Sequence, residues 1–228
     1  MKQLLLILAM VALAGCGKKV AVDKKPLTQS EVIEWMIRFE LKKPTGELTK
    51  TDLEKVERLI LNWGPNSNRQ QLSDLTGLEN LTQLTVLRLG GNQLTDVKGL
   101  EKLTQLTTLQ LNDNQLTDVK GLENLTQLKT LGLRGNQLTD VKGLENLTQL
   151  KELYLGGNKL TDVASLENLT QLTILYLDGN QLTDMKSLEK LMKLETLYLE
   201  DNPDLTKAQI AELQKALPKC EIHSNPTK

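Results

Sequence analysis

A segment of 22 residues is repeated along most of the chain. The repeats begin at regularly spaced leucines, namely Leu87, Leu109, Leu131, Leu153, Leu175 and Leu197. A period of this length is the signature of a solenoid, in which each repeat forms one coil that stacks on the next. Aromatic residues make up only 3% of the chain, so leucine must supply most of the core. An unordered leucine core packs loosely, whereas leucines aligned on successive coils can fill one continuous core.

Each position in the repeat has a structural role that the sequence predicts. Residues 131–150 read LGLRGNQLTDVKGLENLTQL, in which two leucines flank one residue that faces outward from a short strand. We expect the recurring asparagines to be buried and to bond backbone groups of neighbouring coils; they are Asn92, Asn114, Asn136, Asn158, Asn180 and Asn202. We expect the recurring aspartates to cap the turn that follows each of them; they are Asp96, Asp118, Asp140, Asp162 and Asp184. Stacked carboxylates can also hold calcium, but adjacent lysines disfavour that alternative.

The pattern L-x-L-x-x-N-x-L resembles that of leucine-rich repeats. The 22-residue length and the continuation N-Q-L-T-D-V-x-x-L-x-x-L-x-x-L resemble the internalin type, over roughly residues 48–202. The resemblance implies an α/β solenoid of horseshoe shape. Its parallel sheet lines the concave side, and its convex segments are short 3₁₀ turns or irregular. Internalins act in host-cell adhesion, but a resemblance in fold does not identify a binding partner, so an adhesion role for this chain would rest on analogy only.

The two ends of the repeat array are expected to carry helical caps. Residues 28–58 form the N-terminal cap, which begins with the capping-box pattern Thr28-Gln-Ser-Glu31. Residues 59–202 form the repeats, with an imperfect first strand at 59–61 and a polar loop insertion at 64–71. Residues 203–228 form the C-terminal cap.

The C-terminal cap has its own capping box at Thr206–Gln209, followed by an apolar helical face of Ile210, Leu213 and Leu217. Residues 220–222 are expected to add a last strand. We interpret Cys220 as a small buried cap residue; an intermolecular disulfide is the alternative.

The first residues have the features of a bacterial lipoprotein signal. Residues 1–15 place one lysine before an apolar run, 4–14, that is too short to cross a bilayer, which takes about 20 residues. The run ends in Leu13-Ala14-Gly15-Cys16, which resembles the lipobox that directs lipid attachment to the cysteine. The alternative is an ordinary signal peptide. We therefore expect a lipid on Cys16, a lysine-rich tether over 16–27, and removal of 1–15.

This signal predicts a lipid-anchored location in the bacterial cell envelope. Gly17 follows the cysteine, whereas an aspartate there retains lipoproteins of diderm bacteria in the inner membrane. The expected site is the outer membrane if the host is diderm, and otherwise the outer face of the cytoplasmic membrane. Periplasmic and surface-exposed orientations both stay open.

The concave face is the predicted contact surface. All three tyrosines of the chain, Tyr154, Tyr176 and Tyr198, fall between the two leucines of consecutive strands, where they would form a contiguous aromatic column. Neighbouring outward positions add Arg88 and Arg134 at a basic end and Asp178 and Glu200 at an acidic end. Tyrosine is enriched at binding surfaces, although stacked tyrosines can also serve only to stabilise adjacent strands.

Composition restricts the function classes. With 28 basic and 29 acidic residues there is no basic excess for nucleic acid, and the single histidine, His223, excludes a multi-histidine metal site. No nucleophile–base set, metal cluster or phosphate loop is recognisable, so we predict no enzyme activity, no catalytic or metal-binding residue and no cofactor. We expect a monomer that binds a protein through its concave face. A glycan-binding protein and a purely structural envelope protein are the alternatives.

Overall fold

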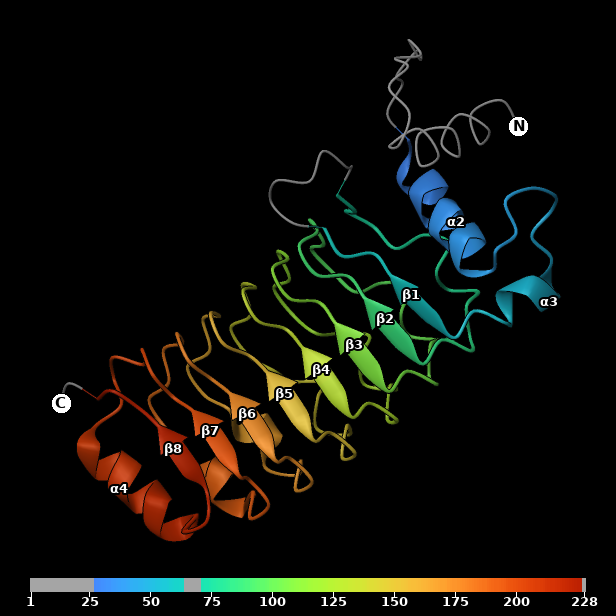
Figure 1. The fold of residues 1–228 in the computed structure, drawn as a ribbon. Coiled ribbons are helices and arrows are strands. Elements are labelled where there is room, and N and C mark those ends of the chain that lie inside the picture. The colour runs from blue at the N-terminus through green and yellow to red at the C-terminus, as the bar shows by residue number, and fades with distance from the viewer. Residues whose placement is uncertain (1–26, 64–70, 227–228) are drawn as a thin grey trace, which may run out of the picture.

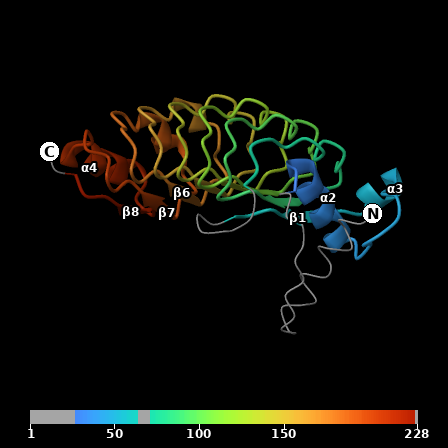
Figure 2. The same cartoon turned by 90° about the horizontal axis from the view of Figure 1, so that it is seen from above.

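The computed structural model describes residues 27–63 and 71–226, which form a curved stack of coils (Figure 1). Eight strands form one parallel sheet in sequence order, and Figure 2 shows the strands along one long side of the stack and the returning segments along the other. The strands are β1 (Arg58–Ile60), β2 (Val86–Arg88), β3 (Thr108–Gln110), β4 (Thr130–Gly132), β5 (Glu152–Tyr154), β6 (Ile174–Tyr176), β7 (Thr196–Tyr198) and β8 (Glu221–His223). The predicted leucine-rich-repeat horseshoe is confirmed.

The repeat period sets the register of the sheet. Leu87 lies opposite Leu109, which lies opposite Leu131, and the same pairing continues to Ile222 at β8. The central leucine of each strand from β1 to β7 is at most 1% exposed, and the residues on either side of it face outward. Full burial of one leucine side chain stabilises a fold by roughly 2 kcal/mol, so the aligned leucines are the main source of stability.

The buried asparagines tie the coils together. Asn136 donates from Nδ2 to the carbonyls of Leu111 and Leu133, each at 3.0 Å, and its Oδ1 accepts from the Leu116 amide at 3.0 Å. All six ladder asparagines are between 3% and 7% exposed. The prediction that they are structural amides satisfied by backbone groups is confirmed.

Within the described residues, the convex side consists of turns and two short 3₁₀ helices, η2 (Ala164–Leu166) and η3 (Lys186–Lys190). The recurring aspartates cap the turns as predicted: Asp140 Oδ1 accepts from the Lys142 amide at 3.1 Å, and each of the other four makes the equivalent bond. These local bonds fix the tight turn that lets the chain return to the sheet within one repeat.

Helix α2 (Gln29–Glu40) covers the first coil. Its predicted capping box at Thr28 and Glu31 is present, and Val32, Ile33 and Ile37 are buried in the same core as the leucines. The expected loop insertion at 64–71 lies outside the described residues except for Gln71.

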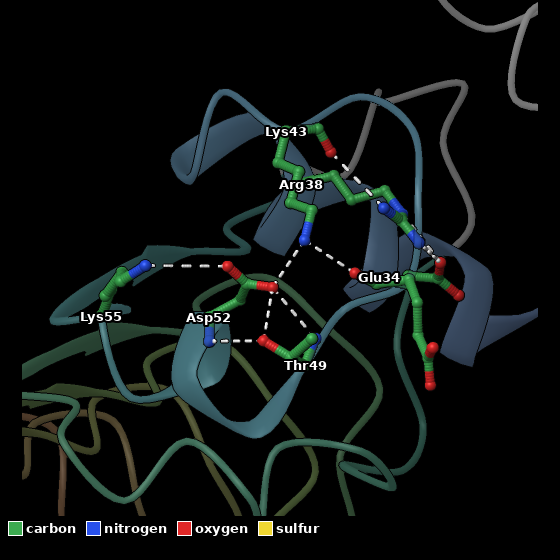
Figure 3. A network of polar contacts seen from close by, with 7 residues as sticks. Glu34, Arg38, Lys43, Thr49, Asp52 and Lys55 are labelled. Carbon is green, nitrogen blue, oxygen red and sulfur yellow. Dashed lines mark hydrogen bonds and ion pairs between the residues drawn. The ribbon is translucent and has the colours of Figure 1, made fainter.

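A short helix, α3 (Lys50–Leu53), follows α2 and is locked by a polar network (Figure 3). Lys43 Nζ donates to Asp52 Oδ2 at 2.6 Å and to the Glu47 carbonyl at 2.7 Å. The Thr49 amide and hydroxyl donate to the same Asp52 oxygen at 3.0 and 2.8 Å. The Lys43 bond, followed by those of Thr49, holds the pKa of Asp52 well below its usual range.

Helix α4 (Lys207–Ala216) and strand β8 close the other end. Leu213, Leu217 and Cys220 are at most 4% exposed, so the interpretation of Cys220 as a buried cap residue is confirmed. Burial, followed by the nearby Glu221 carboxylate, raises the pKa of the Cys220 thiol to about 11. The last strand is present, one residue later than predicted.

No helix in the described ranges is both long enough and apolar enough to cross a membrane. The predicted signal peptide, the lipidated Cys16 and most of the tether fall in 1–26, outside the described residues.

Candidate functional site

The three tyrosines form a continuous stack on the outer face of the sheet, as the register predicts. The ring centroids of Tyr154 and Tyr176 are 5.0 Å apart, and those of Tyr176 and Tyr198 are 4.2 Å apart. Their ring planes differ by 19° and 9°, so the rings lie face to face. Strands spaced by about 4.8 Å bring the rings to this distance without distortion.

His223 extends the stack by one ring, which the sequence analysis missed. It lies opposite Tyr198 in the sheet, with ring centroids 4.6 Å apart and planes 9° apart. Its Nε2 is 3.3 Å from Glu221 Oε1. We call the four rings of Tyr154, Tyr176, Tyr198 and His223 the aromatic strip.

The strip presents ring edges and hydroxyl groups to solvent, because the rings cover each other's faces. Tyr176 and Tyr198 each have a ring on both sides, and only the two end rings have a face that no strip member covers. The Tyr154 hydroxyl donates to Glu152 Oε2 at 2.9 Å. Burial and then this bond raise the pKa of Tyr154 to about 12, and a bond with Tyr198 and then burial raise the pKa of Tyr176. These two hydroxyls are neutral near pH 7, as an ordinary tyrosine is, and they keep their protons to a higher pH.

Arg134 and Asp178 are joined across one intervening coil. Arg134 Nη2 is 3.1 Å from Asp178 Oδ2, although the two residues belong to coils that are not neighbours. The coil between them has Gly156 at the equivalent position, and a Cβ there would lie 2.4 Å from Asp178 Oδ1. The missing side chain at Gly156 leaves the space in which Asp178 lies. Arg134 thus reaches from the basic end of the face toward the acidic end.

Polar side chains lie beyond the Tyr154 end of the strip. Asn112 donates from Nδ2 to Gln110 Oε1 at 2.8 Å and accepts from the Arg134 amide at 2.9 Å. Gln110 extends over Gly132, where a Cβ would lie only 2.0 Å from its Oε1. The strip therefore ends at Tyr154, and the amide side chains of Gln110 and Asn112 follow it along the sheet.

The structure brings together six of the seven predicted contact residues. Glu200 lies on the coil of Tyr198, and Arg134 and Asp178 lie beside the middle of the strip. Arg88 is the exception, since it is exposed on β2, three strands from Tyr154. Among the residues that the structure describes, no group of three or more His, Cys, Asp or Glu side chains is arranged to hold a metal ion.

A family model described as Leucine Rich repeats (2 copies) matches the chain three times, at residues 82–124, 126–168 and 170–215. The chain belongs to the leucine-rich-repeat family. This membership indicates a protein–protein interaction module, in agreement with the repeats and the open sheet. No curated protein matches the sequence significantly.

Two solved structures of Listeria monocytogenes internalins resemble this leucine-rich-repeat protein. The internalin inlF is 30% identical with a TM-score of 0.76, and the match covers 86% of this chain and 57% of inlF. Internalin C2 is also 30% identical, with a TM-score of 0.74, and the match covers 85% of this chain and 84% of internalin C2. This chain thus spans little more than half of inlF but most of internalin C2.

Proposed function

We propose that this leucine-rich-repeat protein is a lipid-anchored binding module of the bacterial cell envelope, and that its concave face recognises a protein through the aromatic strip. The observation that supports this proposal is the strip itself. Every tyrosine of the chain lies in one column of one face, in a stack of half-buried rings with hydroxyl groups at their outer ends. Tyrosine provides large contact area at a low entropic cost, which suits it to protein interfaces.

Strand pairing alone does not require these rings. Strands β2, β3 and β4 keep the same register with Arg88, Gln110 and Gly132 at the equivalent position. Aromatic residues are therefore dispensable for the sheet, and their restriction to one end favours a recognition role over a purely structural one.

The ring geometry favours a protein over a glycan. Sugars stack on open aromatic faces, whereas the two inner rings of the strip are covered on both faces at 4.2–5.0 Å. Edges and hydroxyls remain available, and these suit side chains and backbone groups of a polypeptide.

A capture experiment tests this proposal. The full chain, purified in non-ionic detergent and immobilised, is exposed to envelope extract of its own organism, beside a variant with Tyr154, Tyr176 and Tyr198 changed to alanine. A variant with Phe39→Ala and Met192→Ala is the control, because these side chains are 64% and 65% exposed but lie outside the strands. We expect a protein that wild type and control retain and the tyrosine variant loses. Equal retention by all three, with folding verified by circular dichroism, contradicts the proposal and favours a structural role.

The anchor is a separate part of the proposal and rests on the Leu13-Ala14-Gly15-Cys16 motif. Two or three acyl chains on Cys16 would give stable membrane attachment, because each buried CH₂ contributes about 0.8 kcal/mol. Labelling with an alkyne fatty acid should mark the wild type and a Cys220→Ala variant but not Cys16→Ser. Label on Cys16→Ser, or none on the wild type, contradicts the anchor.

A further inference from the structure

We infer that the partner of this concave face presents a basic polypeptide segment, rich in lysine or arginine, to the aromatic strip. This inference rests on the proposed function and specifies the chemistry of its partner. Its basis is a complete separation of charge along three rows of outward-facing residues: the strip row and the rows on either side of it.

The acidic half of these rows surrounds the strip. On strands β5–β8 and the residues that follow them, the two flanking rows contain four carboxylates and no lysine or arginine. Glu152 and Glu221 lie on one side of the rings, and Asp178 and Glu200 lie on the other. At the margins there are two further carboxylates, Glu195 and Asp201, and one lysine, Lys151.

The basic half lies on strands β1–β4. The same three rows contain Arg58, Arg88 and Arg134 there, and no carboxylate. The whole chain has 28 basic and 29 acidic residues, so this separation is a property of the face and not of the composition. Arg134 neutralises Asp178 at the boundary, which leaves Glu152, Glu200 and Glu221 as the carboxylates that face a partner at the strip.

The strip and its carboxylates suit a basic segment better than a neutral one. Four rings on strands about 4.8 Å apart span about 14 Å, the length of about four extended residues. Lysine and arginine can lay their aliphatic stems along ring edges while their charged heads reach carboxylates on either side. An acidic partner would instead place like charges together on both sides of the rings.

Selection from random peptides tests this inference without knowledge of the natural partner. Short random peptides displayed on phage are selected on the full chain in detergent, with counter-selection on the variant that has Tyr154, Tyr176 and Tyr198 changed to alanine. We expect the retained peptides to be enriched in lysine and arginine. Enrichment of neutral or acidic peptides, or no enrichment above background, overturns the inference.

A charge-matched pair of variants then locates the contact. One variant changes the three strip carboxylates to glutamine, at Glu152, Glu200 and Glu221. The control variant makes the same change at three exposed glutamates outside the strands, Glu47, Glu189 and Glu212. Affinity for the best selected peptide, measured by fluorescence anisotropy, should fall about tenfold in the first variant, because each exposed ion pair contributes modestly. It should change less than about twofold in the control, and rising salt should weaken wild-type binding. Equal loss in both variants overturns the inference, since it would reflect net charge alone.

The two proposals fail in different ways. If the tyrosine variant loses the envelope partner but selection yields no basic peptides, the concave site stands and the basic-segment inference is wrong. If the tyrosine variant retains every partner and every selected peptide, the concave site itself is wrong.

Discussion

Replacement of the ladder asparagine Asn136 by alanine is predicted to destabilise the fold by about 2–4 kcal/mol. The magnitude follows from what each bonded group keeps after the change. The Leu111 carbonyl also accepts from Asn114, and the Leu133 carbonyl also accepts from Asn158. These two carbonyls each lose one of two side-chain bonds and stay partly satisfied.

The Leu116 amide has no such reserve, because its hydrogen bond to Asn136 Oδ1 is the only one that the structure gives it. Leu116 is 0% exposed, so water cannot replace the lost acceptor. An orphaned buried amide costs about 1–3 kcal/mol, and the two weakened carbonyl contacts add about 1 kcal/mol.

Equilibrium unfolding in urea, followed by circular dichroism, measures this loss. The matched control is Asn146→Ala in the same repeat, because Asn146 is exposed and makes no side-chain hydrogen bond within the described residues. We expect the free energy of unfolding of the control to lie within about 0.5 kcal/mol of the wild-type value. A similarly small change for Asn136→Ala, or an equal loss in both variants, would refute the account of the ladder.

Three further predictions concern the strip, the N-terminal cap and Cys220. Gly156→Ala should displace Asp178 and break its bridge to Arg134, because the new Cβ would lie 2.4 Å from Asp178 Oδ1. A crystal structure with the bridge intact would contradict this. The Arg134 and Asp178 side chains are 54% and 22% exposed, so solvent screens the bridge on the Arg134 side, and its loss should change the free energy of unfolding by less than about 1 kcal/mol. Asp52 has a lower pKa folded than unfolded, so it stabilises the fold above the ordinary aspartate value near pH 3.9 and loses that contribution as the pH falls below it. Asp52→Asn should make the free energy of unfolding less dependent on pH in that range. Urea unfolding at a series of acidic pH values measures this, and an identical dependence on pH for variant and wild type would be inconsistent with the network. Cys220 should react with a disulfide reagent about a hundredfold more slowly in the native protein than in urea, because its thiol is buried and its pKa is raised to about 11. The rates are measured in a Cys16→Ser background, so that only Cys220 reacts. Equal rates in the two conditions would show that the cap is open.

The sequence predicts most of the fold because the repeat fixes the role of each position. In the coil of Leu131, Leu131 and Leu133 point inward and Gly132 points outward, and the equivalent residues of every other coil must do the same. The strands, their register and the tyrosine column therefore follow from the period alone. The buried asparagines and capping aspartates are predictable for the same reason.

Two features of the candidate site depend on geometry that the period does not contain. From Leu197 to its partner Ile222 is 25 residues, because helix α4 replaces the usual convex segment, so His223 falls outside the repeat frame. Cys220 and Ile222 are apolar and alternate with Glu221 and His223, as inward and outward residues of a strand do. This alternation was the signal that could have added His223 to the tyrosine column.

The bridge between Arg134 and Asp178 was also missed. It joins coils two repeats apart, whereas a column drawn from the sequence suggests contact only between adjacent coils. Gly156 between two opposite charges was the available signal, since a position without a side chain permits contact across it.

Site-specific photo-crosslinking in living cells tests the central claim most directly. A benzophenone amino acid replaces Thr196, which flanks the aromatic strip on β7, or Lys120, which is exposed on a convex turn. The concave-site account predicts that irradiation links a partner protein to the chain from position 196 and not from position 120. A partner linked only from position 120, or from neither position while the chain is folded and expressed, would contradict recognition through the concave face.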